Sequence, residues 1–176
     1  MGHGTSMPLQ QQGLLSDVVV HEMGHVLGFG TYWNALGLLA EPSLQGGLDP
    51  HFTGPVAIAG FDSAGGSAYV GAKVPVENTG GPGTADAHWR DAVFGTEIMT
   101  GYIDFGANPL SATTIASFAD LGYTVDMTAA DPFILPSPAA MPGVRRRLWL
   151  GNDLRLYPRR RLDPRAKIAP PFRPDR

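Results

Sequence analysis

The chain of 176 residues contains no cysteine. This absence excludes disulfide bonds and thiolate metal sites, so a transition-metal site could be built only from histidine and carboxylate side chains. No uninterrupted apolar run approaches the roughly 18 residues that a membrane-spanning helix requires. The first residues also lack the basic and apolar regions of a signal peptide. The sequence therefore predicts no transmembrane segment and leaves the cellular location open.

Basic side chains are scarce over most of the chain and crowded near its end. Residues 1–140 contain only Lys73 and Arg90 against 13 acidic residues, which gives a formal charge of −11. Residues 141–176 contain ten arginines and Lys167 against three aspartates, which gives +8. Clustered arginines attract phosphate, but no aromatic stacking platform or binding fold accompanies them. We therefore expect no nucleic-acid binding.

The two ends of the chain differ in composition from the part between them. Eight prolines fall from Pro136 onward among the arginines, and such a composition cannot bury much apolar surface. We expect residues 136–176 to form a disordered tail, with a local helix near 145–150. Residues 1–13 are polar and are expected to be a disordered lead-in. One modest domain is expected over 14–135.

A short apolar stretch of this domain contains a chemical pattern. His21, Glu22 and His25 form the arrangement H-E-x-x-H. On a helix, four residues advance the chain by about 400°, so both histidines emerge on one face, one turn apart. Two imidazoles at that separation can bind one Zn²⁺, and Glu22 can act as general base instead of as a ligand. The alternative is a pair of ordinary surface or core histidines.

The third ligand does not stand where the metzincin pattern H-E-x-x-H-x-x-G-x-x-H would place it. Gly28 occupies the glycine position, but Thr31 stands at the position of the third histidine. Two later histidines remain, His51 and His88. Eleven residues after His88 comes Met99, in a Glu-Ile-Met-Thr-Gly segment that is typical of the methionine turn beneath a metzincin metal. We predict His88 as the third ligand, with His51, in a loop that could fold back, as the alternative.

This combination resembles the leishmanolysin-like metallopeptidases, metzincins with a long insertion before the third histidine. The resemblance is carried by residues 21–29, 88–89, 97–99 and 117–123. It implies an α+β fold, a metzincin-like catalytic domain with an active-site helix, an irregular insertion, a methionine turn and a C-terminal helix. A twisted β-sheet precedes the helix in that family, and 13 residues cannot build it. We therefore expect an N-terminally truncated relative that lacks most of this sheet. Because the chain has no cysteine whereas the eukaryotic members are disulfide-rich, the resemblance also implies a prokaryotic-type relative.

The resemblance also implies an activity, the hydrolysis of internal peptide bonds in protein or peptide substrates with one zinc ion. His21, His25 and His88 would bind the ion, and Glu22 would take a proton from the zinc-activated water and pass it to the leaving amine. The family is mostly secreted or surface-associated, although no signal peptide is visible here. Two alternatives remain: a non-catalytic zinc-binding remnant of such a peptidase, and a basic-tailed binding protein with an accidental helix motif.

Four further residues are expected around the site. Met99 should shape its floor without binding the metal. Tyr102 could stabilise an oxyanion, or it could be a partly buried structural tyrosine. Glu97 and Asp86 could orient the ligand histidines by hydrogen bonding, a role that carboxylates often take.

Residues that break helices and strands, together with the spacing of apolar residues, predict the other secondary-structure elements. We expect a helix from 14 or 16 to 27, an irregular loop over 29–52, a helix from 55 to about 65, an edge strand at 74–77, a helix from Ser111 to 122, and an extended segment over 124–135. A buried strand is the alternative for the region that begins at 55.

Overall fold

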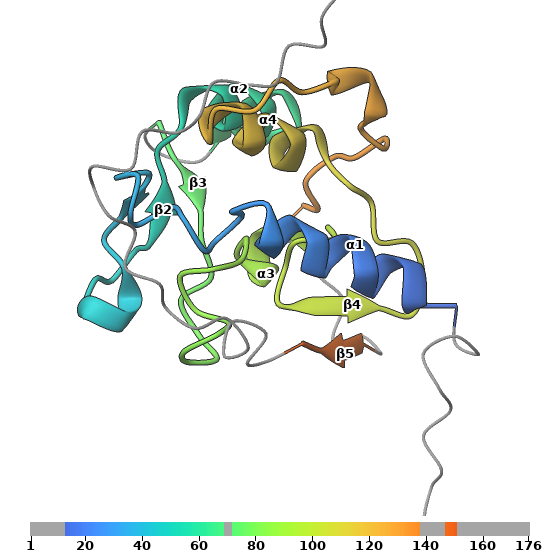
Figure 1. Cartoon of the computed structure of the whole chain (residues 1–176), viewed down its shortest axis with the longest axis horizontal. Helices are drawn as coiled ribbons and strands as arrows, with labels where there is room; N and C mark the ends of the chain where they lie inside the picture. Colours follow the sequence, from blue (N-terminus) through green and yellow to red (C-terminus); the bar gives the residue numbers. More distant parts are fainter. Residues whose placement is uncertain (1–12, 69–71, 138–146, 151–176) are drawn as a thin grey trace, which may run out of the picture.

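The structure is a computed structural model that describes residues 13–68, 72–137 and 147–150. These ranges contain four α-helices and five short strands in two antiparallel sheets (Figure 1). The predicted α+β class is therefore confirmed. The predictions for 1–12 and for most of the tail lie outside the described residues. Within the described ranges, every helix is too short or too polar to cross a bilayer.

Helix α1 (Leu15–Val26) confirms the predicted helix around the histidine motif. Its buried face carries His21, Gly24 and His25. The opposite face is exposed and apolar, and it comprises Leu15, Val19, Val20, Met23, Val26 and, just past the helix, Leu27. A helix that packs on one side only usually carries polar residues on its exposed face. Helix α1 differs, because it is apolar around most of its circumference. The structure therefore buries only one of the two apolar sides of this helix.

A three-stranded sheet has the order β1 (Leu39–Ala40), β2 (His51–Phe52), β3 (Val74–Pro75). Pro75 lies on the edge strand, as predicted, where its missing N–H breaks no ladder. The prediction of a wholly irregular 29–52 loop is wrong, because β1, the 3₁₀ helix η2 (Ser43–Gln45) and β2 lie within it or at its end. Strands of two residues are too short to show periodicity, and their pairing partners lie far away in the sequence.

Helices α2 (Pro55–Ser63) and α4 (Ala112–Asp120) pack against each other, at the top of Figure 1. Helix α2 begins after a glycine, which has no side chain that could cap the helix N-terminus. The Asp120 carboxylate of α4 caps it instead, accepting from Val56 N at 3.1 Å and Ala57 N at 2.9 Å. Ser111 caps α4 by accepting from Thr114 N, as predicted. Both helices confirm the predictions, and the strand alternative for the first is wrong.

The remaining elements are short. The helix α3 (Asp91–Phe94) and the strand β4 (Tyr102–Asp104) were not predicted. β4 pairs with β5 (Arg147–Trp149), so the helix expected near 145–150 is wrong over 147–149, where hydrogen bonds to β4 give a strand. The segment 124–135 forms no strand and is irregular apart from η4 (Met127–Ala129); the 3₁₀ helix η3 (Gly66–Ala68) follows α2.

An aromatic cluster forms the core next to the histidines. Its rings belong to Phe29, Trp33, Phe52, Trp89 and Phe94, all 0% exposed. Trp89 lies at the centre, with ring centroids 4.9 Å from Phe29, 4.9 Å from Trp33 and 5.4 Å from Phe94. Two of these residues adjoin the site, since Trp89 follows His88 in the sequence and the Phe29 ring lies 6.1 Å from that of His25. This aromatic cluster therefore lies next to the histidines.

Candidate metal centre

Three imidazole rings converge on one point. α1 carries His21 and His25 one turn apart on its buried face, and the loop before α3 brings His88 to them. The Nε2 atom of His25 lies 3.0 Å from those of both His21 and His88, which are 3.2 Å from each other. Each of the three side chains is at most 2% exposed. Over the described part of the chain, this is the group of histidine and acidic residues whose donor atoms are close enough to hold a metal ion.

Backbone carbonyls determine which nitrogen of each ring carries the proton. Each ring donates from Nδ1: His21 to Ile98 O at 2.7 Å, His25 to Phe29 O at 3.0 Å and His88 to Thr84 O at 2.9 Å. A carbonyl oxygen can only accept, so Nδ1 holds the proton and Nε2 presents a lone pair. The short contacts between the Nε2 atoms are therefore not hydrogen bonds. Three lone pairs point at one another, an arrangement that a cation would stabilise.

The environment of His25 and His88 favours the neutral form of their rings. Burial, followed by the charge of His21, lowers the pKa of His25 from 6.5 to about 3, against the opposing effect of the Phe29 carbonyl. Burial likewise lowers the pKa of His88 well below its usual value, with contributions from His25 and then His21. Neutral imidazole is the form that binds Zn²⁺. Tetrahedral bonds of 2.0–2.1 Å place donors about 3.3 Å apart, so the observed spacing fits zinc.

Met99 forms the floor of the site, as predicted. Its side chain is 1% exposed and lies against α1 at Gly24, between the two histidines of the helix. A Cβ atom at Gly24 would lie 2.8 Å from Met99 Cε and 2.9 Å from its Sδ. Glycine at this position therefore allows the methionine turn to pack directly beneath the helix.

The two residues considered for chemistry, Glu22 and Tyr102, are both half-buried. Glu22 is half-buried on α1, one residue and about 100° around the helix from His21. Tyr102 is half-buried at the start of β4, three residues after Met99.

The carboxylates of Glu97 and Asp86 bond to backbone and hydroxyl groups instead of to the ligand rings. Glu97, fully buried, accepts from Met99 N at 2.6 Å and from groups of α4. Burial raises its pKa, while hydrogen bonds, that from Thr114 first, act in the opposite direction. Asp86 accepts from Ser43 N at 2.7 Å and Leu44 N at 2.8 Å of η2. The predicted direct contact with ligand histidines is therefore not observed for either residue.

Gly30 is a positioning residue that the sequence pattern did not reveal. Its φ of +68° is left-handed, and a Cβ atom there would lie 2.1 Å from the carbonyl oxygen of Ala87. The chain leaving α1 thus contacts the backbone immediately before His88. Thr31, at the position of the third metzincin histidine, donates from Oγ1 to His25 O at 3.0 Å. The sequence feature that could have revealed Gly30 was the pair of glycines, two residues apart, that follows the histidine motif.

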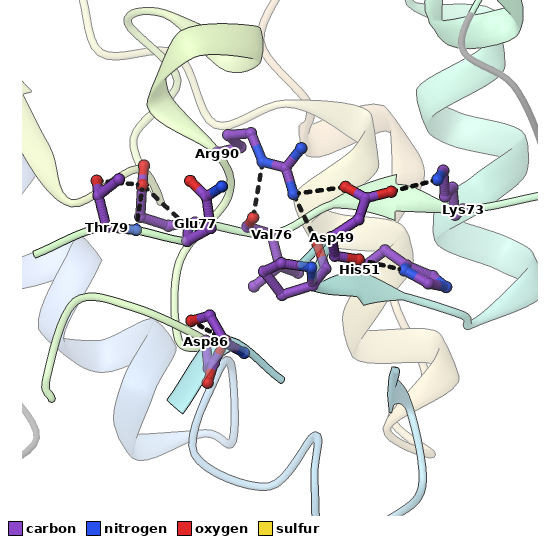
Figure 2. Close-up of polar contacts among 11 residues, drawn as sticks. Asp49, His51, Lys73, Val76, Glu77, Thr79, Asp86 and Arg90 are labelled. Carbon is purple, nitrogen blue, oxygen red and sulfur yellow. Dashed lines mark hydrogen bonds and ion pairs between the residues drawn. The ribbon is translucent and has the colours of Figure 1, made fainter. Parts of the chain in front are cut away.

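A polar scaffold supports the loop that carries His88 (Figure 2). Glu77 is 5% exposed, and its carboxylate accepts from the backbone N–H groups of residues 78, 79 and 91. Its own N–H donates to His88 O at 2.9 Å. Arg90 donates to Val76 O and to the carboxylate of Asp49, at 2.9 Å each. These contacts, which join segments distant in the sequence, hold both sides of the third histidine.

His51, the alternative third ligand, lies outside the histidine group. It is half-buried in β2, and its ring donates from Nδ1 to Asp49 O at 2.7 Å, within the scaffold of Figure 2. The structure thus brings His88, and not His51, to the two histidines of α1.

Comparison with known proteins places this arrangement in a family. The family model for leishmanolysin matches residues 5–140, which include all three converging histidines and the methionine turn. No curated protein and no solved structure matches the chain significantly. The matched family is one of zinc-dependent peptidases, and the buried histidine triad could hold the metal that such a peptidase needs. The chain belongs to the leishmanolysin family of metallopeptidases.

Proposed function

We propose that this protein is a zinc-dependent metalloendopeptidase that hydrolyses internal peptide bonds of proteins. The observation that carries the proposal is the convergence of three imidazoles on one point, 3.0–3.2 Å apart at Nε2. His21, His25 and His88 would bind the ion, and residues 14–135 would form the catalytic domain. When bound, zinc supplies a Lewis acid and lowers the pKa of water from about 15.7 towards 7.

The residues of the chain supply orientation and proton transfer. The carbonyls of Ile98, Phe29 and Thr84 fix the three rings with Nε2 facing inward. Glu22, half-buried beside the first ligand, takes the proton of the attacking water on its carboxylate and returns it to the leaving amine. The aromatic core behind the histidines keeps water away from one side of the site.

The experiment measures zinc per chain and cleavage of an unfolded protein substrate for the wild type and three variants. Glu22→Gln should keep about one zinc and lose roughly 10²- to 10⁴-fold in kcat, because a positioned general base contributes that much. His88→Ala should lose both zinc and activity. His51→Ala is the matched control, a histidine of the same domain outside the triad, and should change neither.

Three results would contradict the proposal. A wild-type protein that holds zinc but cleaves no substrate would be the non-catalytic remnant. Undiminished cleavage by Glu22→Gln would show that Glu22 takes no part in the reaction. Zinc retained by His88→Ala but lost from His51→Ala would exchange the roles of the two histidines.

A further inference from the structure

The methionine turn holds the metal centre through two backbone carbonyls. The turn closes with a hydrogen bond from Thr100 N to Glu97 O at 3.2 Å. Its Ile98 carbonyl accepts the Nδ1 proton of His21 at 2.7 Å, and its Met99 carbonyl accepts from Trp89 N at 3.0 Å. Trp89 is the residue next to His88. One turn therefore fixes a ligand ring directly and the backbone beside a second ligand.

The turn is itself anchored by one buried carboxylate. Glu97 is 0% exposed, and its Oε2 accepts from Met99 N at 2.6 Å. Its Oε1 faces the start of α4, where it accepts from Ser111 N at 3.1 Å, Ser111 Oγ at 2.8 Å and Thr114 Oγ1. The side chain of Glu97 thus spans the gap between the methionine turn and the first turn of α4.

The hydroxyl groups of Ser111 and Thr114 can each donate to the carboxylate of Glu97. Trp89 Nε1 donates to Thr114 Oγ1 at 2.8 Å, and Thr114 N donates to Ser111 Oγ at 3.2 Å. Each hydroxyl already accepts an N–H, so its own proton is available to Glu97. Both carboxylate oxygens also accept from a backbone N–H. A glutamine has a single acceptor oxygen, so it would leave one of these buried N–H groups facing its amide.

We propose that Glu97 is a positioning residue for the metal centre. Its carboxylate fixes the methionine turn against α4 and, through the Ile98 carbonyl, fixes the imidazole of His21. The same turn carries the Met99 side chain that lies under Gly24, so any displacement of the turn would move the carbonyl and the floor of the site together. The inference rests on the proposed zinc site and adds a residue whose contribution is made without contact to the metal or the substrate.

The test compares two carboxylate-to-amide substitutions, Glu97→Gln and Asp120→Asn. Asp120 is the matched control, because its carboxylate also joins α4 to a distant segment, accepting from the backbone N–H groups of Val56 at 3.1 Å and Ala57 at 2.9 Å. These contacts lie at the N-terminus of α2 and involve neither the methionine turn nor the loop that carries His88. Both variants should lose stability, so stability alone would not distinguish the two roles.

The distinguishing readouts are zinc affinity, measured by competition with a chelator, and the visible absorption of the Co²⁺-loaded protein. Glu97→Gln should bind zinc about 10- to 100-fold more weakly than the wild type, the range found for residues that orient metal ligands. Its Co²⁺ bands should shift, because the His21 ring is no longer held in one orientation. Asp120→Asn should bind zinc within about threefold of the wild type and leave the Co²⁺ bands in place.

A second variant covers the case in which Glu97→Gln does not fold. Glu97→Asp keeps the charge and shortens the side chain by one methylene, so it can reach Met99 N or α4 but not both. Equal zinc affinity and Co²⁺ spectra in the wild type and either folded Glu97 variant would overturn the inference. Failure of both Glu97 variants to fold where Asp120→Asn folds would also overturn it, because Glu97 would then serve the whole fold. A wild type that binds no zinc would instead overturn the proposed function.

Discussion

The two parts of the ligand set are held in different ways. His21 and His25 lie one turn apart on α1, and the helix alone fixes their separation. His88 arrives 63 residues after His25 in a loop, where polar contacts from distant segments hold it. The comparison teaches that a helix can present two ligands locally, whereas a third ligand needs tertiary structure to bring it into place. Changes that act on the loop should therefore affect the site without altering the helix.

The largest effect is expected from Gly30→Ala, which breaks the contact between the end of α1 and the loop of His88. The new Cβ atom would meet the Ala87 carbonyl at 2.1 Å in a left-handed backbone conformation. Both partners are backbone, so neither can move cheaply, and we expect a loss of about 4–5 kcal/mol in the free energy of unfolding. Urea denaturation of the metal-free protein measures it.

Gly37→Ala is the control for that substitution. Gly37 has a similar φ of +71°, but a Cβ atom there would meet nothing within 4 Å. Only the left-handed conformation is penalised, at about 1 kcal/mol. Equal losses in the two variants would show that the close approach to Ala87 contributes nothing.

Acid should destabilise the metal-free protein through two histidines, His25 on α1 and His88 in the loop. The folded-state pKa of His25 is about 3 and that of His88 lies well below 6.5, the unfolded value. Below pH 6.5 the unfolded chain therefore binds protons that the folded chain does not, so stability is complete above this pH and falls as the pH decreases. Each histidine should contribute about 1.4 kcal/mol per pH unit. Thermal unfolding between pH 7.5 and 5 in the presence of a chelator measures the slope.

A flat stability profile over this pH range would mean that the two rings are protonated, or accessible to water, in the folded state. Replacing His88 by Gln should reduce the slope, since one of the two buried rings is removed. An undiminished slope in that variant would assign the effect to α1 alone.

A smaller effect is expected from Asp86→Asn, which weakens the hydrogen bonds between η2 and the loop that carries His88. Asparagine tolerates the left-handed φ of +66° as well as aspartate, so the substitution tests the carboxylate and not the backbone. Its single acceptor oxygen cannot serve both Ser43 N and Leu44 N, and we expect a loss of about 2 kcal/mol. Asp126→Asn, which removes a comparable acceptor of Thr128 N on the exposed surface, should barely change the unfolding midpoint.

The sequence predicted the local features of the site well. The helix of the motif, the cap of α4 by Ser111 and the edge position of Pro75 depend on neighbouring residues, and the structure confirms each. The placement of His88 beside α1 was predicted from a pattern shared with a family, and the structure shows the same placement. Local rules and a family motif together therefore indicated the three converging histidines.

Tertiary contacts account for what was missed. The strands β1 and β2 exist because distant residues pair with them, and β4 pairs with β5 across more than forty residues. Glu97 and Asp86 could have oriented the ligand rings, but each bonds instead to backbone groups that the sequence could not place nearby. Gly30 could be read as a loop glycine, and its approach to Ala87 is visible only in three dimensions.

If the triad binds zinc as proposed, it would also connect the lifetime of the molecule to its metal supply. A ligand that binds only the folded chain stabilises it in proportion to the logarithm of the ligand concentration over Kd. Without a cation, the three lone pairs of the triad repel one another, so the metal-free chain opens more often. Proteases that cleave the open form will then remove metal-free molecules and spare those that hold the ion. The triad would in this way select, among copies of the chain, those fit to act.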